Sequence, residues 1–179
     1  MKAATVSQLK KELTYRSPEE LLELCLRLSK FKKENKELLT YLLFESLDEE
    51  EYIRNIKSEI DLEFKAINTE NFFYIKKSVR KILRNIKKYS RYSLKKETEA
   101  ELLLYFLAKL KEMRPSITRN TTLVNLYKRQ LTTVRKLVSS LHEDLQYDYQ
   151  EELEELEDLK YRSSPVFFPL NNSNITRGF

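Results

Sequence analysis

The stretch that decides the fold is Leu102-Leu103-Leu104-Tyr105-Phe106-Leu107, a run without a single charged residue. It lies inside a segment from about Lys95 to Met113 in which Leu, Lys and Glu favour a helix, and Pro115 ends that helix. A helix that is apolar on every side is buried against other elements. The sequence therefore predicts that this helix forms the centre of the molecule.

The first third of the chain contains strong helix start signals. Ser17-Pro18-Glu19-Glu20 combines a serine N-cap, a proline at the first helical position and a glutamate that closes a capping box. The helix that begins there is expected to run to about residue 31, with the thiol of Cys25 buried and reduced among leucines. A short first helix is expected before it, over about 6–14. A third helix is expected over about 34–47, with an inward face made of Leu38, Leu39, Leu42 and Leu43.

Three further long helices are predicted: two precede the central helix in the sequence and one follows it. Asp48 caps the first, whose apolar stripe is Ile53, Ile56, Ile60, Phe64 and Ile67. Asn68 is expected to cap the second, which runs to about residue 89. After Asn120, the third carries a heptad seam that indicates close antiparallel packing: Tyr127, Leu131, Val134, Val138, Leu141 and Leu145.

These patterns predict seven or eight helices, in an all-α multi-helix bundle or a short α-α superhelix. Residues 147–161 either continue the helix that follows Asn120 or form another one. Short connections between helices imply that neighbouring helices run antiparallel.

The composition excludes the common catalytic motifs. The only glycine is Gly178, so the chain cannot build the glycine-rich loops of P-loop or Rossmann enzymes. One histidine, His142, and one cysteine exclude a Cys/His zinc site, and we expect His142 to lie on the surface. The sequence therefore predicts no cofactor and no metal, although carboxylates from distant helices are still free to converge.

The opening of the chain resembles the start of an uncharacterised, all-helical bacterial family of unknown function. The residues that carry the resemblance are Leu9-Lys10-Lys11-Glu12-Leu13 followed by Ser17-Pro18-Glu19-Glu20-Leu21-Leu22-Glu23-Leu24. It covers about twenty residues. It implies a helical fold and carries neither an activity nor functional residues to transfer.

The helix expected over 72–91 separates charged from apolar side chains most sharply. At about 100° per residue its cations share an arc of about 140°, and its apolar residues share another arc on the opposite side. No acidic residue interrupts this basic stripe, which is about 23 Å long at ~1.5 Å rise per residue. It favours sequence-independent contact with a polyanion, and a solvated face or internal charge pairing is the alternative. The stripe consists of Lys76, Lys77, Arg80, Lys81, Arg84, Lys87, Lys88 and Arg91.

The C-terminal part of the chain is acidic and then apolar. Nine of the 28 carboxylates lie in the segment 143–158, so the rest of the chain holds 19 carboxylates against 33 lysines and arginines. This acidic segment either masks the basic stripe or meets a partner. In the tail that follows, two prolines favour an extended backbone. The tail either packs over the core or docks on another protein through Phe167, Phe168 and Leu170.

Taken together, these features predict one all-helical domain over 1–161 and an extended tail over 162–179. We expect a cytoplasmic protein with no membrane span, because no apolar run approaches the ~20 residues that a span needs. The leading function is a non-enzymatic helical scaffold or protein-interaction module, with an unidentified protein partner or a second copy of the chain. The first alternative is a nucleic-acid-associated protein that binds phosphates through 72–91. The second alternative is an enzyme whose carboxylates converge between helices.

Overall fold

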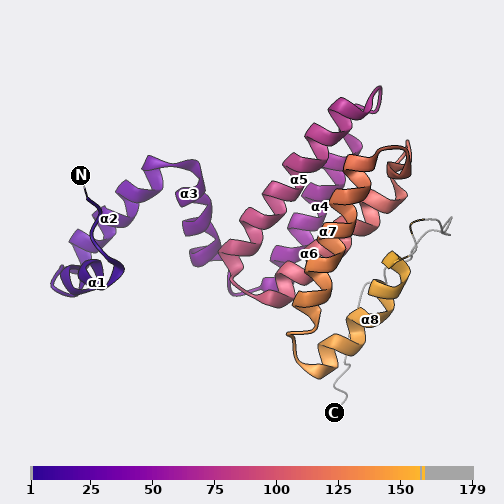
Figure 1. The fold of residues 1–179 in the computed structure, drawn as a ribbon. Coiled ribbons are helices and arrows are strands. Elements are labelled where there is room, and N and C mark those ends of the chain that lie inside the picture. The colour runs from indigo at the N-terminus through magenta and orange to yellow at the C-terminus, as the bar shows by residue number, and fades with distance from the viewer. Residues whose placement is uncertain (1, 158, 160–179) are drawn as a thin grey trace, which may run out of the picture.

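The computed structural model describes residues 2–157 and 159, and within them the all-α prediction is confirmed (Figure 1). These residues form eight α-helices and no strand. No helix among them is both long enough and apolar enough to cross a membrane. The helices are α1 (Val6–Thr14), α2 (Pro18–Phe31), α3 (Lys33–Thr40), α4 (Glu49–Lys65), α5 (Phe72–Ser93), α6 (Lys96–Glu112), α7 (Thr121–Val138) and α8 (Glu143–Glu157).

Helix α6 lies at the centre, as its all-round apolarity predicts. Leu102, Leu103, Phe106 and Leu107 have no exposed surface. Four helices, α4, α5, α7 and α8, pack around α6. The residues of α6 are therefore the middle of a bundle made by α4–α8.

The helices around α6 each bury one apolar stripe. In α4 the stripe contains Ile53, Ile56 and Ile60, as predicted, and in α5 it contains residues such as Ile75 and Ile86. Helix α5 begins later than expected, because Asn71 rather than Asn68 accepts the hydrogen bonds of its first backbone N–H groups.

The heptad seam after Asn120 is buried except at its last position, Leu145, which is half-buried, and it does not lie on a single helix. Tyr127, Leu131, Val134 and Val138 line the inner face of α7. The hydroxyls of Ser139 and Ser140 then bond back to the carbonyls of Lys136 and Leu137, where α7 ends. The remaining two seam positions fall in the connection and in α8, so 147–157 belong to a separate helix.

Helices α1, α2 and α3 form an arm that extends away from the bundle (Figure 1). None of their residues is buried. The prediction that Leu38, Leu42 and Leu43 turn inward is wrong, since all three are exposed. The physical reason is a π-helical turn, η1 (Tyr41–Glu45), in which the Ser46 N–H donates to the Tyr41 carbonyl at 2.8 Å. This register turns Tyr41 into the core in place of the leucines.

Candidate functional site

Most of the basic stripe on α5 lies on the open surface. Six of its eight cations make no hydrogen bond through their side chains and no ion pair within the described part of the chain, and five of those six are exposed. The six are Lys76, Lys77, Arg80, Arg84, Lys87 and Arg91. Opposite them, Ile75, Val79, Ile82 and Ile86 are buried in the core. The predicted separation of charge from core is therefore present in the structure.

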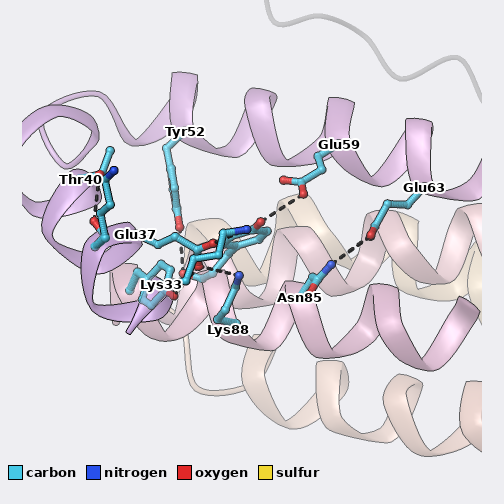
Figure 2. Close-up of polar contacts among 11 residues, drawn as sticks. Lys33, Glu37, Thr40, Tyr52, Glu59, Glu63, Asn85 and Lys88 are labelled. Carbon is cyan, nitrogen blue, oxygen red and sulfur yellow. Dashed lines mark hydrogen bonds and ion pairs between the residues drawn. The ribbon is translucent and has the colours of Figure 1, made fainter. Parts of the chain in front are cut away.

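The other two cations of the stripe are paired at the edge that faces α3 and α4. The ammonium of Lys88 lies 2.6 Å from Glu37 of α3, and that of Lys81 lies 2.9 Å from Glu63 of α4. Asn85 also donates to Glu63, at 3.1 Å (Figure 2). Ion pairs with other parts of the described chain therefore occur only at this edge of the stripe, where they hold α5 to α3 and α4.

The acidic segment does not mask the basic stripe, which corrects one of the two expectations for it. Helix α8 packs against α6 and α7, on the side of the bundle away from α5 (Figure 1). Its ion pair runs to α7, from Glu157 to Arg135 at 2.6 Å. Buried Tyr127 also holds α8, by donating to the Leu156 carbonyl at 2.7 Å. Within the described residues, no hydrogen bond or ion pair joins α8 to the stripe.

The arm carries a large set of exposed apolar side chains. Leu22 is 60% exposed and Phe31 is 78% exposed, although both lie on a well-formed helix. Cys25 is exposed as well, so the expectation of a buried thiol is wrong. That expectation failed because the leucines next to Cys25 are themselves exposed. We use the name apolar arm for the segment 6–47, which comprises α1, α2, α3 and the residues of η1 and the turn after it. Its exposed apolar residues are Val6, Leu9, Leu13, Tyr15, Leu22, Leu24, Leu26, Leu28, Phe31, Leu38, Leu42, Leu43, Phe44 and Leu47.

Helix α2 shows why the arm is not covered by the chain itself. At about 100° per residue, its apolar side chains span an arc of about 220°. Helix α3 packs along the middle of this arc, where Leu21 and Ser29 are half-buried. Two strips remain free beside it, one with Leu24 and Leu28 and the other with Leu22 and Leu26.

A cleft of about 230 Å³ lies where the arm meets the bundle. Three carboxylates and three tyrosines are among the groups that line it. Glu37 accepts from Lys88 at 2.6 Å and from Tyr92 at 3.0 Å, and Glu59 accepts from Tyr89 at 3.1 Å (Figure 2). These six groups are Glu37, Glu45, Glu59, Tyr52, Tyr89 and Tyr92, and Thr40, Asn55 and Ile56 complete the lining.

The pKa shifts of three groups in the cleft agree with the hydrogen bonds that these groups make. Burial opposes the charge on Glu37, but the hydrogen bonds from Lys88 and Tyr92 outweigh it and lower the pKa of this carboxyl. Burial beside carboxylates raises the pKa of Tyr89 and of Tyr92. At neutral pH the Glu37 carboxylate is therefore charged and the two phenols are neutral. In these states Lys88 and Tyr92 hold the arm to the bundle through Glu37, and Tyr89 joins α5 to Glu59 of α4.

Sequence reasoning missed a second anchoring group, Glu49. It directly follows Asp48, which caps α4 as predicted, and in the sequence it is one of three glutamates in the first turn of that helix. Glu49 instead accepts from Ser93 at 2.5 Å, from Thr98 at 2.6 Å and from Tyr41 at 2.9 Å. It joins η1 to the end of α5 and the start of α6. No local pattern marks it, because these partners lie far away in the sequence.

The remaining predicted positions give no site. His142 is exposed, and within the described residues no cluster of His, Cys, Asp or Glu is able to hold a metal ion. The candidate docking residues Phe167, Phe168 and Leu170 lie outside the described residues. Comparisons of the chain with protein-family models, with curated proteins and with solved structures found no match.

Proposed function

We propose that the chain is a non-enzymatic, helical protein-interaction module, in which the apolar arm binds helices of a protein partner and the bundle holds the arm in position. The observation that carries this proposal is the apolar arc of α2, which is wider than its neighbour α3 covers. Monomeric proteins rarely expose large contiguous apolar surfaces, because their contact with water is unfavourable by ~25 cal/mol per Å².

The arm is ordered locally, without a core of its own. Capping boxes start α1 and α2: the Thr5 hydroxyl accepts from the Gln8 backbone N–H, and Ser17 accepts from Glu20. Each box satisfies two backbone donors that would otherwise be free at the helix end. A docking surface that is already helical loses less conformational entropy on binding than a disordered one.

The spacing of the exposed residues specifies the chemistry of the partner. Leu24, Leu28 and Phe31 recur every three to four residues along one strip of α2. A strip of this kind fits the apolar face of an amphipathic helix, whose anchors recur at the same spacing. Such a helix would cover the part of α2 that α3 leaves exposed.

The test is site-specific photo-crosslinking of the full chain in cells that make it. A benzophenone side chain replaces Leu22 on the arm or, as the matched control, Leu62, which is 66% exposed on bundle helix α4. We expect a discrete adduct with another protein from position 22 and none from position 62. An adduct of twice the mass of the chain would show that the partner is a second copy of this chain and not a different protein. Equal adducts at both positions, or none at either, would contradict the proposal.

A further inference from the structure

We infer that the exposed part of the basic stripe, together with Phe73 and Tyr74, is a binding surface for single-stranded nucleic acid. This surface lies on α5, a helix of the bundle, and the inference does not depend on the proposed function of the arm. We define the cationic ridge as the six stripe residues without an acidic partner in the described chain: Lys76, Lys77, Arg80, Arg84, Lys87 and Arg91.

The ridge is not explained by the stability of α5. Cations spaced four residues apart on a helix repel each other, and Arg80 has such a neighbour on both sides, Lys76 and Arg84. The first turn of α5 contains no acidic residue to complement the helix dipole, whereas the first turn of α4 contains three. A stable solvated helix would mix both signs of charge. A run of uncompensated cations instead favours a polyanion as its counterpart.

The fold leaves the ridge accessible. The apolar side of α5 faces α6, and α8, which carries most of the acidic segment, packs on the other side of the bundle. The two paired cations, Lys81 and Lys88, lie at one edge, so the six ridge residues remain continuous over about 23 Å at ~1.5 Å per residue. The buried apolar side of α5 also disfavours a membrane surface, because a surface helix inserts that side between lipids.

Aromatic side chains extend the ridge at its N-terminal end. Phe73 precedes Lys76 by three residues, which places it within the arc of the ridge. It is 67% exposed and makes an edge-to-face contact with the ring of Tyr74, at 5.5 Å between centroids. Exposed rings next to cations are the combination by which proteins stack unpaired bases while holding the backbone phosphates. Unpaired bases are available in a single strand and not inside a duplex.

The test is fluorescence anisotropy of a labelled single-stranded 20-nucleotide RNA with the full chain. If about four phosphates are contacted, the logarithm of affinity should fall with the logarithm of salt concentration with a slope of about −2.8, from ~0.7 per phosphate for a single strand. The triple variant Arg80→Glu, Arg84→Glu, Lys87→Glu should lose binding at least about 100-fold, because reversal replaces attraction by repulsion.

The matched control is Lys10→Glu, Lys11→Glu, Lys30→Glu on the arm, which changes the net charge from +5 to −1 in the same way as the ridge variant. These three lysines are exposed and make no ion pair within the described residues. Their reversal should change affinity by no more than about threefold, since no phosphate contact is removed. An equal loss in both variants would show an effect of net charge alone and would overturn the ridge as a site.

A second variant tests the stacking contribution and does not alter charge. Phe73→Ala should weaken single-strand binding roughly 5- to 140-fold, the range measured for one stacked base, and should leave duplex binding unchanged. Circular dichroism of each variant verifies that it is folded, and Arg80→Gln with Arg84→Gln replaces the triple reversal if that variant is not. No binding at 50 mM salt, equal binding of single strand and duplex, or binding only to anionic vesicles would overturn the inference.

Discussion

Replacing Leu107 by Ala should destabilise the protein far more than the same change at Leu22. Leu107 lies in α6 and has no exposed surface. The substitution removes three carbon atoms from the core, worth about 2.4 kcal/mol at ~0.8 kcal/mol per buried methylene. A residual cavity of about 50 Å³ would add about 1 kcal/mol at ~24 cal/mol per Å³. We therefore expect Leu107→Ala to lower the free energy of unfolding by about 3.5 kcal/mol.

Leu22→Ala is the matched control, because it deletes the same atoms on the arm. Leu22 is 60% exposed, so less than half of that burial is lost, about 1 kcal/mol. The higher helix propensity of Ala offsets a few tenths of a kcal/mol of it. Urea denaturation followed by circular dichroism measures both changes. Equal losses in the two variants, or a loss below about 1 kcal/mol for Leu107→Ala, would refute the assignment of α6 as the core and of the arm as a free surface.

Further predictions concern the anchoring groups. Glu49→Gln should cost about 1–3 kcal/mol in urea unfolding, because charge-assisted hydrogen bonds from Ser93, Thr98 and Lys95 are weakened; an unchanged midpoint would argue against the network. Burial opposes ionisation of Glu49, but its hydrogen bonds lower the pKa of this carboxyl below its ordinary value of 4.5, so the folded state binds fewer protons. The stability that Glu49 contributes is therefore complete above pH 4.5 and is lost as the pH falls below 4.5. In Glu49→Gln the free energy of unfolding should decline less steeply as the pH falls. An equally steep decline in the variant would contradict this. Tyr127→Phe should cost about 0.5–1.5 kcal/mol by removing the hydrogen bond to the Leu156 carbonyl, and it should increase protease cleavage between α7 and α8; an unchanged cleavage rate would show that this bond does not hold α8.

The bundle was predictable because the apolar pattern within each of its helices shows which face of that helix is buried. The run Leu102–Leu107 is apolar on every side, and the isoleucines of α4 and α5 recur at helical spacing. The basic stripe was predictable for the same reason, since its cations fill the arc of α5 opposite to Ile75 and Ile86. The structure adds which of these cations are paired.

The arm and its joint were not predictable. The leucines of α2 and α3 have the same periodicity as those of a buried helix, and periodicity shows which face requires cover without showing that the chain supplies it. The π-helical turn that buries Tyr41 has no sequence signal of its own. The pair of Glu37 and Lys88 joins residues 51 positions apart, and only the tertiary fold brings them together.

The central claim is that the exposed leucines of the arm serve binding and do not serve folding. It is tested most directly by the variant Leu22→Gln, Leu26→Gln, Leu28→Gln, which keeps good helix formers at exposed positions of α2. Urea unfolding and photo-crosslinking from position 31 of the arm are measured on the same preparation of the full chain. The account predicts that the free energy of unfolding falls by about 1 kcal/mol per substituted leucine, as for Leu22→Ala, that unfolding stays cooperative, and that the adduct is lost. Loss of cooperative unfolding, or an adduct that persists, would contradict it.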